Sequence, residues 1–310
     1  MDFVIFVVSM ALLVGGADII IRASHSLALK LNISEFLIGA SLIALGTSLP
    51  QIATVSISII ENRADMAISI IIGSNIFNIT LLFATIFLLF KRINISKEFF
   101  IKNSFWLIAS ISLFILVSLD NIISIIDYIV LIIFMIAYIR FLFHDAKDID
   151  KEFIDDISQT TLTLSRSIFL FIIGILALIF GAFFSVDSAI NIASMFKLND
   201  WQVGIIMISL GISLPQLALT ILAIYKSKVE IAMGNIISSN IANSTIVLGI
   251  SAIITPIKID LTHHIFDISI MVVSTIYIAI ILITKNYTRT ISIVMFLLLT
   301  LFIDNLIRNI

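Results

Sequence analysis

The chain has 310 residues, a formal net charge of −2 and a mean hydropathy of +1.21. Charged residues make up only 12% of it, about half of the share that is usual in soluble domains, and hydrophobic residues make up 60%. This composition excludes a soluble globular protein, because so few polar residues could not cover its surface. The absence of cysteine excludes disulfides, thiolate metal sites and cysteine catalysis, and the small net charge gives no indication of nucleic-acid binding.

Apolar stretches long enough to cross a bilayer follow one another along the chain, and we interpret ten of them as transmembrane helices. The first has no basic region before it and no small-residue cleavage site, so we expect a retained span and not a signal peptide. The fourth and fifth are divided at Asp120 and Asn121, because one helix of about 40 residues would be twice as long as a bilayer requires. The predicted spans are residues 3–21, 36–60, 66–90, 103–119, 121–143, 167–186, 201–225, 231–256, 266–284 and 290–308.

Basic residues are distributed unequally between the two ends of these spans. If both termini lie on one side of the membrane, that side holds 4 of the 18 Lys and Arg residues, and the other side holds 14. The positive-inside rule then predicts that the basic side is cytoplasmic and that both termini lie outside. The expected location is a plasma membrane or an inner membrane.

The same unusual sequence occurs twice. GASLIALGTSLPQ at 39–51 is matched by GIIMISLGISLPQ at 204–216, and IIGSNIFNIT at 71–80 is matched by IISSNIANST at 236–245. Both pairs have the same offset of 165 residues, without a gap. Polar segments interrupted by Gly and Pro, at corresponding places in two halves of a membrane protein, are typical of a transporter with its binding site at the middle of the bilayer.

Each half contains five predicted spans, and an odd number turns the second copy upside down in the membrane. We therefore predict an all-α integral membrane protein with ten transmembrane helices arranged as two inverted five-helix repeats. Its expected parts are residues 1–143, an acidic cytoplasmic linker at residues 144–166, and residues 167–310. A monomer is sufficient for this arrangement, and the sequence does not indicate an oligomeric state.

The repeated segments contain the groups that a cation site needs. Pro50 lacks a backbone donor and is expected to kink its helix and free the carbonyl oxygens near residues 46 and 47, and Pro215 repeats this in the second half. A bound cation is one partner for such oxygens inside a bilayer, and hydroxyl and amide oxygens are hard ligands that suit Na⁺ or Ca²⁺. Helix packing is the alternative role for these side chains, but two gapless copies favour a site. The predicted ligands are Ser48, Gln51, Ser74, Asn78 and Thr47 in the first half and Ser213, Gln216, Ser239 and Asn243 in the second.

These motifs resemble the two α-repeats of the sodium/calcium exchanger family, within the cation/calcium antiporter superfamily. The family pattern G-T-S-x-P-E followed by G-x-x-x-G-S-N-x-x-[N/D] is matched by IALGTSLPQ and ISIIIGSNIFN in the first half, and by ISLGISLPQ and MGNIISSNIAN in the second. The resemblance covers essentially the whole chain. It implies a secondary active antiporter with inorganic cations as its substrates, alternating access at a midplane site, and no cofactor.

The chain departs from the family pattern where the family carries charge. The two site glutamates of the family fall on Gln51 and Gln216, and the aspartate of the second copy falls on Asn243, whose counterpart is Asn78. Ca²⁺ sites set their affinity largely by the number of carboxylates, whereas neutral oxygens can replace the hydration shell of a monovalent ion. We therefore expect selectivity to be shifted toward monovalent cations such as Na⁺, with Ca²⁺ transport left open, and no titration of the site near neutral pH.

Two alternatives to coupled antiport remain open from the sequence. An uncoupled cation pathway would result if the lost charges had removed the need for a counter-ion, and a transport-inactive scaffold would keep the fold without the activity. An enzyme is not expected, because the spans contain no cluster of acids, histidines or nucleophiles. Four acids in or near the spans are secondary candidates for the ion path, namely Asp18, Asp127, Asp187 and Asp304.

Overall fold

The computed structural model describes residues 1–30, 48–89, 97–145, 163–225, 229–254, 256–258, 260–284 and 287–308. Within these ranges the chain forms 10 helical segments, which follow the ten predicted spans in order. Most of the linker predicted at residues 144–166 lies outside the described residues. The same is true of residues 31–47, which include Thr47 and the carbonyl groups near Gly46.

The first half consists of α1 (Asp2–Lys30), α3 (Leu49–Ile60), α4 (Ala64–Phe77) continued by the π-helical turn η1 (Asn78–Phe83) and α5 (Ala84–Leu89), α6 (Lys97–Ser118) and α7 (Ile125–Asp145). The second half begins with α9 (Leu164–Phe196). It continues with α10 (Asp200–Val203), the π-helical turn η3 (Gly204–Ser209) and α11 (Leu210–Tyr225), which form one span, and with α12 (Val229–Ala242), the π-helical turn η4 (Asn243–Val247) and α13 (Leu248–Ile254), which form the next. The 3₁₀ turn η5 (Leu261–His264), α14 (Ile265–Thr284) and α15 (Thr290–Arg308) complete it.

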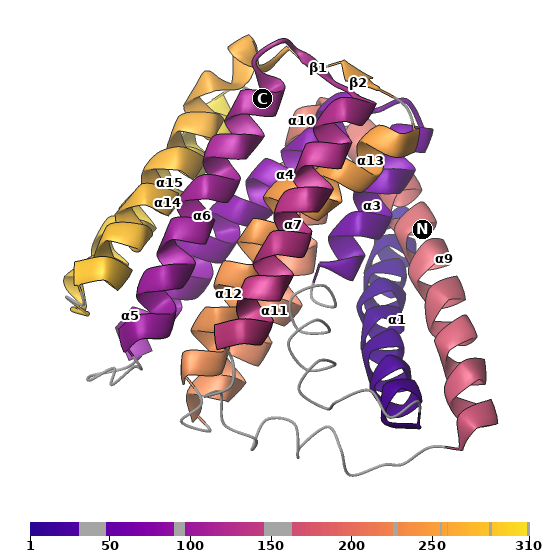
Figure 1. Ribbon diagram of the computed structural model, residues 1–310. Coiled ribbons are helices and arrows are strands. Elements are labelled where there is room, and N and C mark those ends of the chain that lie inside the picture. The colour runs from indigo at the N-terminus through magenta and orange to yellow at the C-terminus, as the bar shows by residue number, and fades with distance from the viewer. Residues whose placement is uncertain are drawn as a thin grey trace.

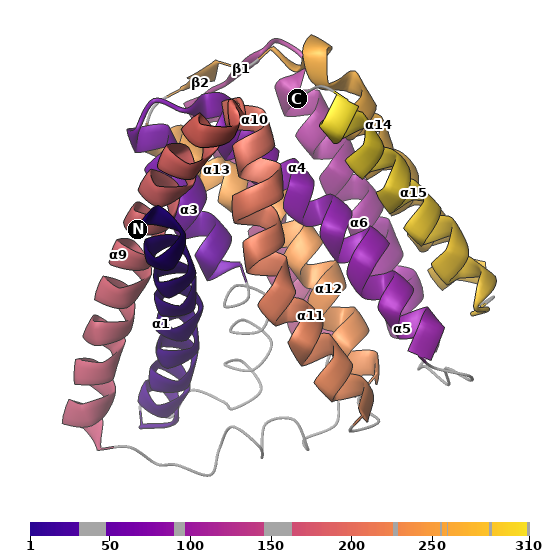
Figure 2. The same cartoon turned by 180° about the vertical axis from the view of Figure 1, so that it is seen from behind.

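The helices are arranged in two flanks around a central group (Figure 1). α1 and α9 lie side by side along one flank, and α5, α6, α14 and α15 form the other, as the view from behind also shows (Figure 2). α3, α4, α11, α12 and α13 lie between the flanks. The central group therefore contains the repeated segments of both halves.

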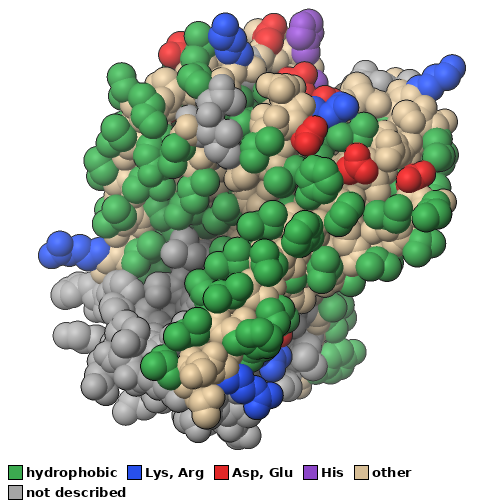
Figure 3. Space-filling view, turned by 90° about the vertical axis from the view of Figure 1, so that its right-hand side faces the viewer, with side chains coloured by type: hydrophobic (Ala, Val, Ile, Leu, Met, Phe, Trp, Pro, Cys, Tyr) green, Lys and Arg blue, Asp and Glu red, His purple; other side chains and the backbone are tan. Residues whose placement is uncertain are grey.

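The outer surface of the molecule is suited to lipid. By length and composition, eight helices of the described chain can cross a membrane, and α3 is a shorter apolar helix. Large apolar side chains such as Phe169, Phe180 and Phe184 of α9 are exposed, and hydrophobic side chains cover much of the flank seen in Figure 3. An exposed apolar surface of this extent identifies an integral membrane protein.

The boundary between the fourth and fifth spans lies where the sequence predicted it. α6 ends at Ser118, and Asn121 adopts a left-handed conformation with a φ of 61°. A feature that was not predicted follows directly: the strands β1 (Ile122–Ile123) and β2 (Ile257–Lys258) pair in an antiparallel manner. This pair joins the two halves at the end of the molecule that also carries the C-terminus (Figure 1).

α1 and α9 are longer than predicted. α9 has 33 residues, which corresponds to a length of about 50 Å, well above the thickness of about 30 Å of a bilayer core. The two helices approach closely at glycine: a Cβ atom on Gly16 would lie 2.8 Å from the backbone nitrogen of Leu178 and 2.9 Å from the carbonyl oxygen of Gly174. Hydropathy did not indicate these extensions, because the extra turns are amphipathic or polar.

The internal repeat is visible in the secondary structure as well as in the sequence. The π-helical turns η1 and η4 begin at Asn78 and Asn243, which occupy the same position in the two copies. In each turn a threonine hydroxyl donates to the carbonyl oxygen four residues before it, Thr80 to Ile76 at 2.7 Å and Thr245 to Ile241 at 2.6 Å. Ten membrane helices in two inverted five-helix repeats are thus the architecture of this protein.

Candidate cation site

The predicted ligands that the structure describes are all buried. Ser48, Gln51, Ser74, Asn78, Ser213 and Asn243 have an exposed fraction of 0%, Ser239 of 1% and Gln216 of 7%. Thr47, the remaining predicted ligand, lies outside the described residues. Polar side chains this deep inside a membrane protein need partners, because bilayer lipid offers none.

α3 begins at the site. Its first residue is Leu49, Pro50 lies in its first turn, where a missing N–H costs nothing, and Gln51 follows. Ser48 is the residue before the helix, yet its hydroxyl caps no backbone N–H of α3. A serine at this position usually accepts such a hydrogen bond, so the Ser48 hydroxyl remains available to a ligand. Pro50 therefore marks the start of the described helix, and the carbonyl groups expected to be freed before it lie outside the described residues.

The second copy differs from the first around its proline. α11 continues through Pro215 from Leu210 to Tyr225, and carries Ser213 and Gln216. The departure from α-helical geometry lies before it, in η3, where the Ser209 hydroxyl donates to the carbonyl oxygen of Gly204 at 2.8 Å. π-helical turns inside longer helices frequently occur at functional sites.

The four helices that carry the predicted ligands adjoin one another across the repeats. α3 packs against α4, α13 and η4, and α11 packs against α12, α4 and η1. Each glutamine-bearing helix therefore contacts the π-helical turn of the opposite repeat, which begins with Asn78 or Asn243. This crossed arrangement brings polar segments of both halves to the centre of the molecule (Figure 1).

Hydrogen bonds also connect the two repeats at this level. The amide nitrogen Nδ2 of Asn243 donates to Oδ1 of Asn75 at 3.2 Å, and Nδ2 of Asn75 donates to the hydroxyl of Ser244 at 2.8 Å. The hydroxyl of Ser209 donates to the carbonyl oxygen of Ile70 at 3.0 Å. Asn75 was not among the predicted ligands, although it is the asparagine of the repeated G-S-N motif, with Asn240 as its counterpart.

Most of the predicted ligands have polar atoms without a hydrogen-bond partner among the described residues. There are 13 such buried side-chain atoms in the described chain, and 10 of them belong to predicted ligands. They are Ser48 Oγ, Gln51 Oε1 and Nε2, Ser74 Oγ, Asn78 Oδ1 and Nδ2, Ser213 Oγ, Gln216 Oε1 and Nε2, and Asn243 Oδ1. The others are Asn235 Oδ1, Asn240 Oδ1 and Ser292 Oγ. Unpartnered atoms thus concentrate in the two repeated segments.

Among the described residues, acidic side chains contribute little to this centre. Asp267 is the only acid buried in the described chain, and its two oxygens accept hydrogen bonds from Nε1 of Trp201 at 2.8 Å and from Nδ2 of Asn305 at 3.2 Å. An acid in the first turn of an apolar span is a signal in the sequence for such a residue, but Asp267 was not singled out. No group of three or more His, Asp or Glu side chains that could hold a metal ion occurs among the described residues.

The four acids considered as secondary candidates lie elsewhere. Asp18 forms an ion pair with Arg22 at 2.9 Å and Asp304 with Arg308 at 2.8 Å, and all four side chains are more than half exposed. Asp127 accepts hydrogen bonds from the backbone and hydroxyl of Ser124. Asp187 is exposed on α9. Each of these acids is bound to a near neighbour in sequence or faces outward.

Comparison with known proteins identifies the family. The sequence model of the sodium/calcium exchanger protein family matches residues 1–144 and 166–306. The chain belongs to the sodium/calcium exchanger family. This family consists of membrane antiporters and not of enzymes, and its two matched segments coincide with the two inverted repeats.

Individual relatives agree with this assignment to the exchanger family. CaxA of Alkalimonas amylolytica is 31% identical over 276 residues, which cover 87% of this chain and 86% of CaxA. The sodium/calcium exchanger MaX1 of Methanosarcina acetivorans is 28% identical over 309 residues, covering 87% of this chain and 88% of MaX1. A solved structure of the sodium-calcium exchanger NCX_Mj superimposes with a TM-score of 0.66 at 25% identity and covers 98% of both chains.

Proposed function

We propose that this exchanger-family chain is a secondary active cation antiporter whose central site consists of uncharged oxygen ligands, so that its selectivity is shifted toward monovalent cations such as Na⁺. The ligands are the side chains of Gln51, Asn78, Gln216 and Asn243, assisted by the hydroxyl groups of Ser48, Ser74, Ser213, Ser239 and Thr47. The relatives MaX1 and NCX_Mj are sodium/calcium exchangers, which makes Na⁺ and Ca²⁺ the ions to test.

The observation that carries this proposal is the concentration of buried, unpartnered polar atoms in the two repeated segments. A buried polar atom without a partner costs about 1–3 kcal/mol, so a fold retains a group of them only where something repays that cost. A dehydrated cation does so, because its attraction to amide and hydroxyl oxygens replaces the missing hydrogen bonds. Packing alone does not account for buried atoms that have no hydrogen-bond partner among the described residues.

The charge of the site supports a preference for monovalent ions. The predicted ligands include no acid, and the buried acid Asp267 already accepts two hydrogen bonds elsewhere. The cost of moving an ion into a medium of low dielectric constant rises with the square of its charge, and is of order 20 kcal/mol for a single charge in the idealised limit. Without carboxylates to offset that cost, a divalent ion loses more on entry than a monovalent one does.

The test is isotope flux in proteoliposomes that contain the purified protein, with outward gradients of Na⁺, K⁺, Ca²⁺ or H⁺ applied in turn. We expect ²²Na⁺ uptake that requires a counter-ion and exceeds ⁴⁵Ca²⁺ uptake. Uptake that continues without any counter-ion and follows an imposed membrane potential would instead indicate an uncoupled pathway. Uptake equal to that of protein-free liposomes under every gradient would indicate a transport-inactive scaffold.

The orientation of the chain is part of the proposal. The C-terminus and the β1–β2 pair lie at one end of the molecule, whereas the end of α7 and the start of α9, which flank the linker in the sequence, lie toward the opposite end (Figures 1 and 2). Together with the excess of Lys and Arg on the linker side, this supports a cytoplasmic linker and external termini. Because the chain has no cysteine, single variants can be labelled without background. Asp156→Cys should react with a membrane-impermeant maleimide only after the cells are opened, and Lys258→Cys should react in intact cells.

A further inference from the structure

We infer that Asn75 is a positioning residue of the cation site: it holds the side-chain amide of Asn243 so that the oxygen, and not the nitrogen, is presented to the ion. This inference rests on the proposed function. Asn75 lies on α4 of the first repeat, and Asn243 is the first residue of η4 in the second. Their exposed fractions are 1% and 0%.

An asparagine ligand has two ends of similar shape and opposite polarity. Its oxygen attracts a cation, whereas its NH₂ group repels one, and a rotation of 180° about the last side-chain bond exchanges them. A carboxylate ligand does not have this problem, because both of its atoms are oxygens. A site that uses amides therefore needs a second group that fixes the orientation of each amide.

Asn75 meets this requirement for Asn243. Its Oδ1 accepts a hydrogen bond from Nδ2 of Asn243 at 3.2 Å, while Oδ1 of Asn243 has no hydrogen-bond partner among the described residues. The orientation of Asn75 is itself fixed from the other side, because its Nδ2 donates to the hydroxyl of Ser244 at 2.8 Å and lies 3.8 Å from the sulfur of Met271. The acceptor end of Asn75 is therefore the end that faces Asn243.

Among the described residues, the equivalent pair, Asn240 and Asn78, lacks the corresponding arrangement. Asn240 is the counterpart of Asn75, but its Nδ2 donates to the carbonyl oxygen of Ile236 in its own helix at 2.8 Å. The counterpart of Ser244 is Ile79, which has no hydroxyl to orient Asn240. Both Oδ1 and Nδ2 of Asn78 are without a partner among the described residues. The two amides that are equivalent in the sequence repeat thus differ within the described part of the chain. Asn243 is oriented by Asn75, whereas no described residue orients Asn78.

A double-mutant cycle tests whether Asn75 acts through the orientation of Asn243. Asn75→Ala is prepared in the parent and in an Asn243→Asp background, and the concentration for half-maximal ²²Na⁺ uptake is measured in proteoliposomes. We expect Asn75→Ala to weaken apparent Na⁺ affinity about tenfold in the parent, as a lost ligand orientation would, and less than about twofold in the Asn243→Asp background. The difference arises because the carboxylate of Asn243→Asp presents an oxygen in either orientation. Equal losses in both backgrounds would overturn the inference, since a structural role of Asn75 does not depend on the chemistry of residue 243.

Asn240→Ala is the matched control, because it removes the same amide from the equivalent position of the other repeat, where the amide nitrogen bonds the carbonyl oxygen of Ile236 and not Asn243. We expect the same small change in both backgrounds. If Asn75→Ala does not yield folded protein, Asn75→Ser takes its place, since its hydroxyl stays near Ser244 but is too short to hold Asn243. Asn243→Ala distinguishes a failure of the proposed site from a failure of the role of Asn75. Unchanged Na⁺ affinity in Asn243→Ala would contradict the proposed site itself. Weaker Na⁺ affinity in Asn243→Ala, together with equal effects of Asn75→Ala in both backgrounds, would contradict only the role of Asn75.

Discussion

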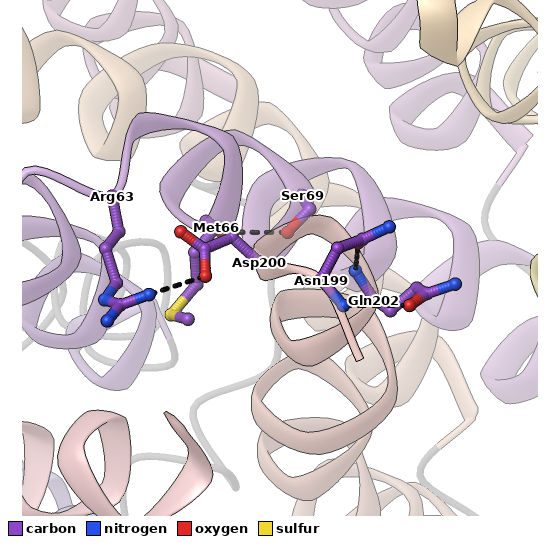
Figure 4. A network of polar contacts seen from close by, with 6 residues as sticks. All are labelled: Arg63, Met66, Ser69, Asn199, Asp200 and Gln202. Carbon is purple, nitrogen blue, oxygen red and sulfur yellow. Dashed lines mark hydrogen bonds and ion pairs between the residues drawn. The ribbon is translucent and has the colours of Figure 1, made fainter. Parts of the chain in front are cut away.

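Arg63 and Asp200 form an ion pair between the two repeats, with 2.7 Å between Nη1 and Oδ1 (Figure 4). Arg63 precedes α4, and Asp200 is the first residue of α10, where a negative charge also suits the positive end of a helix. Beside it, Asn199 and Gln202 form a reciprocal capping box at the start of α10. The pair thus attaches the beginning of the helix that carries the second motif to the turn between the two helices that carry the first.

Reversing this ion pair gives the first prediction. Arg63→Asp and Asp200→Arg should each lower the free energy of unfolding by about 0.5–1 kcal/mol, because the two side chains are about one third exposed and solvent screens their attraction. The combined variant should recover most of the loss, since it restores opposite charges at the same place. Thermal unfolding of the detergent-solubilised protein at low and high salt provides the measurement. A combined variant less stable than either single one would show that the pair does not stabilise the interface.

The second prediction concerns the missing carboxylates. The combined variant Gln51→Glu and Gln216→Glu should raise apparent Ca²⁺ affinity by about tenfold or more, because two negative charges then offset the cost of dehydrating a divalent ion. Competition of Ca²⁺ with ²²Na⁺ uptake in proteoliposomes measures the change. Gln159→Glu makes the same chemical change in the linker and should leave Ca²⁺ affinity unaltered. If the two-site variant binds Ca²⁺ no better than the parent does, these side chains do not line the ion cavity.

The third prediction is that the parent transports Na⁺ at a rate nearly independent of pH between about pH 6 and pH 8, because hydroxyl and amide ligands do not titrate there. The variant with Gln51→Glu and Gln216→Glu provides the contrast. As the pH falls through the pKa of a buried glutamate, the carboxylate gains a proton and loses its charge, so Ca²⁺ transport by that variant should decline toward acid pH. Initial rates at matched gradients test both statements, and a steep pH dependence in the parent would point to a titrating group in the ion path.

Two neighbouring glycines of α1 give the fourth prediction. A Cβ atom on Gly16 would come within 2.8 Å of backbone atoms of α9, whereas one on Gly15 would have nothing within 4 Å. Gly16→Ala should therefore lower stability by about 1–3 kcal/mol, through the forced separation of α1 and α9, while Gly15→Ala should be close to neutral or slightly stabilising. The melting temperatures of the two variants in the same detergent give the comparison. Equal effects would mean that the helices separate without cost at this point.

The sequence by itself determined that the protein is embedded in a bilayer, how many helices it has and in what order, and that its two halves are repeats. Hydropathy and repetition are properties of the chain that do not depend on which helices contact one another. It also indicated most of the side chains that carry buried, unpartnered polar atoms in the described chain, from Ser48 to Asn243, because the repeated motif marks them in both halves. The turn at Asn121 followed from the length of a bilayer span in the same way.

Only the tertiary structure decided how these polar groups meet. Asn75 is one asparagine among several in the motif, and its contact with Asn243 depends on the packing of two helices that are far apart in the chain. The same holds for Arg63 with Asp200 and for β1 with β2. The reason is physical: a repeat specifies the same residues twice, but neighbours such as Ser244 and Ile79 differ between the copies, and hydrogen bonds form with whichever neighbour the fold supplies.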